Sequence, residues 1–151
     1  MIIEYKRLHN NVHPPVRANP SDAGLDVCAY LPDSCVTISP GENAIVATGL
    51  KFGIPHGYML QVCNRSSMGA KRSLIVGAHI IDSGYDGEVF IDLHNVGNQP
   101  QVIGNYDKIA QLVMVPVVSF RALERPSEDL YDWYPITISD RGDGALGSTG
   151  Q

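Results

Sequence analysis

The final residues of the chain, Arg141–Gln151, have a composition that suits the binding of a polyanion. Glycine backbone N–H groups can approach phosphate oxygens closely, Ser148 and Thr149 add hydroxyl donors, and Arg141 supplies a planar guanidinium. The segment has almost no apolar content, so burial cannot offset the entropy lost when it becomes ordered. A solvated terminus has the same composition. The chemical interpretation is a mobile tail that closes over a bound phosphate chain as a lid.

A second candidate set of anion-binding residues follows an apolar segment and lies at the start of a short helix expected over Ser66–Arg72. The set consists of Arg65, Ser66 and Ser67. Either serine can cap such a helix. The free N–H groups and the dipole at the start of the helix favour a bound phosphate. A plain capping sequence has the same pattern, so from these residues alone both interpretations stand.

The segment Ile80–Gly87 carries a candidate general base and joins two expected strands. Asp82 follows the mostly apolar residues 79–81, which predicts a partly desolvated carboxylate able to take a proton from water. Tyr85 can lie flat against a sugar ring, where it would exclude a 2′-hydroxyl and select deoxyribose. The backbone of the same hairpin can present donors and acceptors to a base edge. A tight glycine turn is the structural alternative.

Two further segments contain polar side chains of types that take part in ligand binding or catalysis. Asp22 and Asp26 flank a glycine, which is either an Asx-type turn or a carboxylate site. In the second case a carboxylate would orient waters around a Mg²⁺ ion held mainly by phosphates. Gln111 lies in the last expected strand and is by default a solvated strand residue. It takes part in chemistry only if it faces the same cavity as Arg65.

The elements that must position these residues are mostly short strands. Fifteen glycines and ten prolines interrupt the chain every few residues and leave little room for long helices. The segments between them are rich in Val, Ile and Tyr and predict strands at Ile2–Leu8, Cys35–Ser39, Ala44–Thr48, Tyr58–Cys63, Leu74–Ile81, Glu88–Asn95 and Lys108–Val118. This pattern predicts an all-β fold, either a sandwich, a jelly roll or a barrel.

Composition limits the class of protein. A length of 151 residues with 44% hydrophobic and 18% charged residues fits one domain with a sizeable core. The net charge of −5 provides no basic footprint for duplex nucleic acid. Three cysteines without metal-ligand spacing predict reduced thiols. No apolar run reaches the length of a membrane span, and the N-terminus does not resemble a signal peptide. We expect a soluble cytoplasmic protein, or one in the host cytoplasm if virus-encoded.

The predicted organisation is a β domain over residues 1–140 followed by a flexible, glycine-rich arm over residues 141–151. Residues 121–140 are expected to form an extended connection that contains Trp133 and two tyrosines. Aromatic residues in a connecting arm need a surface on which to lie, and a neighbouring subunit would supply one.

Taken together and in order, these segments resemble the five motifs of the homotrimeric dUTPase family. The motifs are Asp22–Asp26, Arg65–Met68, Gly77–Tyr85, Asp107–Gln111 and Arg141–Gly150. The resemblance covers nearly the whole chain and implies a distorted, jelly-roll-like β-barrel with one short helix and an extended C-terminal arm. It implies a homotrimer with active sites at subunit interfaces. The implied reaction is Mg²⁺-dependent hydrolysis of dUTP to dUMP and diphosphate, which limits uracil incorporation into DNA and supplies dUMP for dTMP synthesis.

The resemblance also implies a role for each site residue. Asp82 would activate the water that attacks the α-phosphorus, and Tyr85 would stack on the deoxyribose. The backbone that would read the uracil edge belongs to His79, Ile80 and Ile81. The residues that would hold the phosphates are Arg65, Ser66, Ser67 and Gln111. Asp26 would support the metal through water. The arm residues that would grip the γ-phosphate are Arg141, Gly147 and Ser148.

Three positions depart from the family pattern. Leu146 stands where a phenylalanine usually stacks over the uracil. Leucine keeps apolar cover but loses base–aromatic stacking worth about 1–3 kcal/mol, so we expect weaker arm closure and a higher KM. His79 replaces a small residue, and we interpret it as a core histidine in preference to one that packs on the base. Gly84 replaces a frequent acidic residue.

Two alternative functions remain open from the sequence. The related dCTP deaminases share the fold, the Arg-Ser-Ser segment and the hairpin, and Gly84 fits them well. Their catalytic glutamate lies ten residues after the hairpin aspartate, where this chain has the shorter Asp92. Tyr85 and the tail favour a dUTPase. The other alternative is a non-catalytic dUTP sensor that binds a protein partner, against which the intact Asp82 argues.

Overall fold

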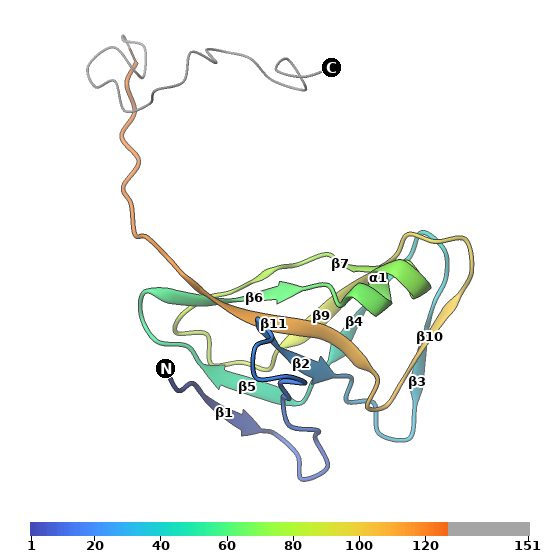
Figure 1. Cartoon of the computed structure of the whole chain (residues 1–151). Coiled ribbons are helices and arrows are strands. Elements are labelled where there is room, and N and C mark those ends of the chain that lie inside the picture. Colours follow the sequence, from blue (N-terminus) through green and yellow to red (C-terminus); the bar gives the residue numbers. More distant parts are fainter. Residues whose placement is uncertain (127–151) are drawn as a thin grey trace. The chain divides into compact units, whose positions relative to one another are not determined.

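The computed structural model describes residues 1–126, and residues 1–119 form one compact unit. Within the described residues the chain forms eleven strands and one helix (Figure 1). In chain order these are β1 (Glu4–Arg7), β2 (Gly24–Cys28), β3 (Cys35–Ile38), β4 (Asn43–Ala47), β5 (Leu50–Gly53), β6 (Tyr58–Cys63), α1 (Ser66–Arg72), β7 (Leu74–Val76), β8 (Ile80–Ile81), β9 (Phe90–Asn95), β10 (Gln101–Gly104) and β11 (Lys108–Pro116).

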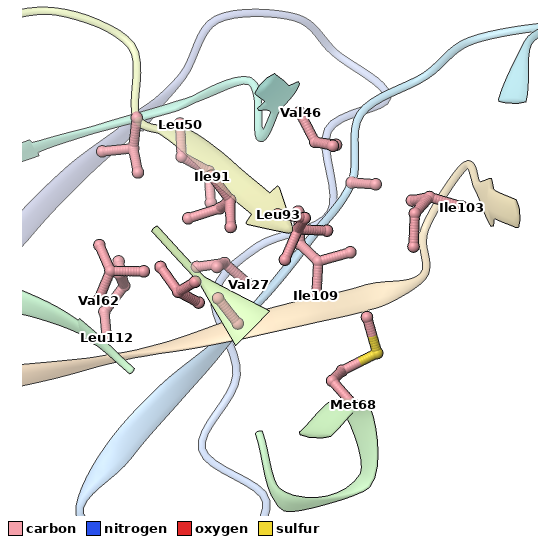
Figure 2. Close-up of a cluster of buried hydrophobic side chains, with 14 of the residues drawn as sticks. Val27, Val46, Leu50, Val62, Met68, Ile91, Leu93, Ile103, Ile109 and Leu112 are labelled. Carbon is pink, nitrogen blue, oxygen red and sulfur yellow. The ribbon is translucent and has the colours of Figure 1, made fainter. Parts of the chain in front are cut away.

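The strands pair antiparallel in two larger sheets and two small ones. The larger sheets have the orders β2-β11-β6-β8 and β4-β9-β7, and the two-stranded pairs are β1-β5 and β3-β10. The core lies between the larger sheets, and Figure 2 shows side chains from both meeting there. Val62 and Leu112 come from the first sheet, and Ile91 and Leu93 from the second, and each is at most 3% exposed. Burial of this kind contributes about 1.5–3 kcal/mol per large aliphatic side chain.

The observed fold confirms the predicted all-β class. Among the described residues the ladders do not close into a barrel, so the fold is a jelly-roll-like arrangement of sheets. The structure describes no helix of a length and apolarity that would cross a membrane. The three cysteines, all within the described range, are free as predicted. The proposed boundary between residues 140 and 141 lies outside the described residues, as does most of the expected connection 121–140.

Two elements have the predicted bounds, and three strands are absent from the prediction. β6 and α1 begin and end at the expected residues. β2, β5 and β10 were not expected as strands because each is only four or five residues long and follows a glycine- or asparagine-containing turn. The difference matters for Asp26, which lies inside β2 and not in a turn.

The segment Leu74–Ile81, predicted as one strand, is two strands in different sheets. The N–H of Gly77 still donates to the carbonyl of Asp92 in β9 at 2.9 Å. Two residues later the carbonyl of His79 accepts from the N–H of Val62 in β6 at 2.8 Å. The chain therefore leaves one sheet and joins the other between residues 77 and 79, which turns the following hairpin away from α1.

The start of α1 also differs from the prediction that a serine caps it. The N-cap residue is Arg65, and it makes no side-chain capping hydrogen bond. The other end of α1 is fastened by Arg72, whose Nε donates to Oε1 of Gln101 at 3.1 Å and whose Nη1 lies 3.5 Å from Oδ2 of Asp107. This contact holds the helix against the turn that leads into β11.

Replacing Gly49 by alanine is expected to destabilise the fold strongly. Gly49 has a φ of +67°, and a Cβ there would collide with the buried side chain of Val12. The control is Gly41→Ala, because Gly41 has a φ of +79° with nothing within 4 Å of its Cβ position. The left-handed conformation alone costs about 1 kcal/mol, and overpacking adds about 1–3 kcal/mol. Denaturant unfolding should therefore rank Gly49→Ala clearly below Gly41→Ala, and equal losses would contradict the steric explanation.

Candidate active site

The first group of functional side chains, here called the phosphate cluster, surrounds the carboxylate of Asp26. Its members are Asp26, Arg65, Ser67, Lys108 and Gln111. The Nε of Arg65 donates to Oδ1 of Asp26 at 2.9 Å, and the Nζ of Lys108 lies 3.1 Å from Oδ2. The Nη1 of Arg65 donates to the Ser67 hydroxyl at 3.3 Å and to the Lys108 carbonyl at 3.4 Å. Because the Asp26 side chain is only 14% exposed, this carboxylate fixes the guanidinium in one orientation.

A bulge in β11 explains why Lys108 and Gln111, three residues apart, both belong to the cluster. In a regular strand, residues separated by three point to opposite faces. Here the register with β2 shifts between Lys108 and Ala110, and the consecutive residues Ile109 and Ala110 are both fully buried. The extra residue turns the strand, and Gln111 then lies directly opposite Asp26.

The sequence assigns no role to Asn64, yet the structure shows that it supports the cluster. Its carbonyl accepts from Nε2 of Gln111 at 2.9 Å, and its side-chain Oδ1 accepts from the N–H of Val76 at 2.7 Å. Asn64 thus joins the ends of β6 and β7 to β11 directly beside Arg65. The sequence feature that marks it is a polar residue between an apolar strand and the Arg-Ser-Ser segment. Ser66, the first residue of α1, is exposed next to Arg65.

The second group, here called the hairpin, comprises residues 80–90. A cavity of about 230 Å³ lies against it, and its lining includes Ile80, Ile81, Asp82, Tyr85 and Phe90. The Tyr85 hydroxyl donates to the carbonyl of Glu88 at 2.7 Å, which lays the ring over Gly87. Two acidic residues, Asp82 and Glu88, line the cavity, and the Glu88 carboxylate accepts from the N–H of Gly49 at 2.7 Å. A largely apolar cavity with few polar groups and a flat aromatic side chain suits a heterocycle attached to a sugar.

Two predictions about this region are wrong for the single chain. Asp82 is exposed and not partly desolvated, because the neighbouring Ile80 is itself 63% exposed and gives it no apolar cover. His79 is also exposed and is not a core histidine. Its Nδ1 lies 2.9 Å from the carbonyl oxygen of Val62, so the ring lies along the backbone of β6.

The phosphate cluster and the Asp82 end of the hairpin lie toward opposite ends of β6. The pairing of β6 with β8 places Ile81 opposite Leu60, so Asp82 continues toward the start of β6, whereas Arg65 follows its end. At about 3.3 Å per residue, the backbones of Asp82 and Arg65 are separated by roughly 20 Å along the strand. One chain therefore brings Asp26, Arg65 and Gln111 together, but not with Asp82 and Tyr85.

Asp92, the residue that a deaminase would use, is engaged elsewhere. Its Oδ1 accepts from Nδ2 of Asn43 at 2.8 Å, and its Oδ2 lies 2.9 Å from Nε2 of His94. Partial burial raises the pKa of this carboxyl, but the hydrogen bonds from Asn43 and His94 outweigh burial and the pKa is lowered. Both oxygens thus have protein partners, and Asp92 is not part of the cavity lining.

The donor set around Asp26 fits a metal ion held mostly by other ligands. No group of three or more histidine, cysteine or acidic side chains gathers anywhere in residues 1–126, so this part of the chain does not enclose a metal by itself. Asp26 already binds two cations, but a carboxylate has about four acceptor positions, which leaves room for a metal-bound water. The predicted arm residues Arg141, Leu146, Gly147 and Ser148 lie outside the described residues.

These features define a jelly-roll-like β protein that combines a cluster of two cations around Asp26 with a separate hairpin cavity. The family model for dUTPase matches residues 10–150. The chain therefore belongs to the dUTPase family.

Curated relatives and solved structures agree with this assignment. The deoxyuridine 5′-triphosphate nucleotidohydrolase of Burkholderia lata is 38% identical over 142 residues, which cover 91% of this chain and 88% of that protein. The Anaplasma marginale protein of the same name is 37% identical over 138 residues, with 90% and 88% coverage.

Among solved structures, the Staphylococcus bacteriophage 80alpha dUTPase with dUpNHpp matches with a TM-score of 0.83 and 24% identity over 99% of both chains. A dUTPase variant from phage phi11 of S. aureus, described with a structural Mg(II) ion, matches with a TM-score of 0.76 and 24% identity over 85% of this chain and 99% of that chain. At this level of identity the likeness establishes the fold.

Proposed function

We propose that this chain hydrolyses dUTP to dUMP and diphosphate, and so limits uracil incorporation into DNA and supplies dUMP for dTMP synthesis. The observation that carries the proposal is a cation cluster oriented by Asp26, combined with the exposed carboxylate of Asp82 beside a cavity of nucleoside size. The names of curated relatives that are 37–38% identical to the chain support the same substrate.

In the proposed complex the hairpin recognises the nucleoside. Tyr85 would stack on deoxyribose, and its ring, held over Gly87 by the hydrogen bond to Glu88, would exclude a 2′-hydroxyl. The backbone of His79, Ile80 and Ile81 would form hydrogen bonds with the uracil edge. Cytosine would leave those backbone groups mispaired, which discriminates strongly in a site shielded from water.

Asp82 would remove a proton from a water molecule as the water oxygen attacks the α-phosphorus. The bond from that phosphorus to the bridging oxygen breaks, and the electron pair leaves with diphosphate. Arg65 and Gln111 would contact phosphate oxygens, with Ser67 holding Arg65 in place and Ser66 close to the bond that is cleaved. Charge neutralisation by groups that are already oriented lowers the barrier without reorganisation during the reaction.

Mg²⁺ is the proposed metal, and it would be held chiefly by phosphate oxygens and water. Asp26 would contact it through one water, since the chain offers no set of acidic ligands there among its described residues. The bound ion would supply additional neutralisation of phosphate charge.

The separation between the hairpin and the phosphate cluster supports a composite site in a homotrimer. One copy would supply Asp82 and Tyr85, and a second copy would supply Asp26, Arg65 and Gln111. Arms from the trimer would close over each site, with the γ-phosphate gripped by Arg141, Gly147 and Ser148, and Leu146 over the base.

The proposal is tested by incubating the protein and Mg²⁺ separately with dUTP, dCTP, dTTP and UTP while diphosphate and ammonia are followed. Diphosphate from dUTP alone is the expected result. Ammonia from dCTP would identify a deaminase and would require Asp92 to leave its partners Asn43 and His94. Binding of dUTP without any product would identify a non-catalytic sensor.

A further inference from the structure

Lys108 is the member of the phosphate cluster to which the proposed mechanism gives no task. Its ammonium lies 3.1 Å from Oδ2 of Asp26, while Arg65 occupies Oδ1 of the same carboxylate at 2.9 Å. A single arginine would be enough to neutralise Asp26. The cluster therefore carries one positive charge more than its own carboxylate requires.

The fold places Lys108 there through a local irregularity. The bulge between Lys108 and Ala110 breaks the alternation of β11, and without it Lys108 would face away from Gln111. Bulges occur preferentially next to functional sites, where they redirect a side chain. The lysine is also the most accessible of the three charged groups, with 40% of its side chain exposed against 25% for Arg65 and 14% for Asp26.

Part of the hydrogen-bonding capacity of the two cations is unused within the described residues. Arg65 uses Nε and Nη1 for protein acceptors, so within residues 1–126 its Nη2 has none. An ammonium has three N–H donors, and the ammonium of Lys108 forms an ion pair with Asp26 at 3.1 Å without a side-chain hydrogen bond of its own among residues 1–126. Two cations with unused donors side by side match the non-bridging oxygens of a polyphosphate better than those of a single phosphate.

We propose that Lys108 is a second polyphosphate-binding cation, held on Asp26 in the free protein and shared with the phosphate chain when a nucleoside triphosphate binds. This inference rests on the proposed function for the identity of the nucleotide. Its consequence is selectivity by phosphate number: the triphosphate substrate engages both Arg65 and Lys108, whereas a monophosphate product engages too few oxygens to hold both.

The test compares Lys108→Met, Lys108→Arg and a control, Lys71→Met, in calorimetric binding of α,β-imido-dUTP and dUMP. Lys71 is an exposed lysine in the last turn of α1 and lies outside the cluster. We expect Lys108→Met to weaken binding of the imido nucleotide about tenfold or more, since a hydrogen bond to a charged group is lost. Binding of dUMP should change less than twofold. Lys108→Arg should stay close to the unsubstituted protein, and Lys71→Met should match it.

Equal affinity of Lys108→Met and the unsubstituted protein for the imido nucleotide would overturn the inference. So would equal loss for both ligands together with a lowered melting temperature, because that pattern belongs to a structural salt bridge. Inorganic triphosphate, which lacks the nucleoside, separates this inference from the proposed function. If the unsubstituted protein does not hydrolyse dUTP but binds triphosphate through Lys108, only the proposed function fails.

Discussion

Replacing Asp82 by asparagine is expected to lower dUTP turnover about a thousandfold while binding of α,β-imido-dUTP persists. Asparagine has nearly the same shape, but its amide cannot accept a proton from the attacking water. Affinity should be retained because Asp82 is exposed on the hairpin and makes no contact with the phosphate cluster of its own chain. Single-turnover kinetics and calorimetry on the same preparation measure the two quantities.

Asp86→Asn is the matched control for this substitution. Asp86 belongs to the same hairpin, is exposed, and its carboxylate pairs with Lys51 at 2.6 Å. The hydrogen bond from Lys51 lowers the pKa of Asp86, and this carboxylate already has a partner within its own chain. Near-normal turnover in Asp86→Asn is expected. A loss as large as that of Asp82→Asn would mean that charge anywhere on the hairpin matters, and that the general base is wrongly assigned.

Mixing two inactive variants is expected to restore activity if each site is built from two copies. Asp82→Asn retains an intact phosphate cluster, and Arg65→Met retains an intact hairpin, because the two groups lie toward opposite ends of β6. In randomly reassembled trimers, roughly a quarter of the sites receive both intact halves. Turnover of dUTP should rise to about that fraction of the unsubstituted protein.

Native mass spectrometry should accompany this experiment to show that mixed trimers have formed. Refolding each variant alone provides the baseline. Mixed trimers without recovered turnover would contradict the composite site and would require the hairpin to move toward the phosphate cluster of its own chain.

The sequence predicts the bounds of a strand or helix best where the residues of that segment alone determine its conformation. β6 is a continuous apolar run between turn residues, and α1 is short and bounded by Arg65 and the left-handed Ser73, so both have the predicted bounds. In β9 the alternation of Ile91 and Leu93 with polar residues gives the correct buried face. The division of Leu74–Ile81 between two sheets depends on partners far along the chain, which no local pattern reveals.

The sequence indicates which residues are candidates for the site better than it indicates which of them lie close together. The grouping of Asp26 with Arg65 follows from β2 and β6 pairing with the two edges of β11, which is a property of topology. The place of Lys108 depends on a bulge, since regular alternation assigns it and Gln111 to opposite faces. The predicted desolvation of Asp82 assumed that apolar neighbours in sequence provide cover, whereas Ile80 faces solvent in the single chain.

The position of β6 between the two functional groups has a consequence for genetics. Arg65 follows one end of this strand, and β8, which leads into Asp82, pairs along it. In the proposed trimer one copy of β6 therefore supports two neighbouring sites. A substitution such as Asp82→Asn would silence one site for each altered copy, and so would behave as recessive. A substitution that displaces β6 would silence two of the three sites for each altered copy. In an equal mixture of altered and unaltered chains, about a quarter of the sites would then remain active, against about a half for Asp82→Asn.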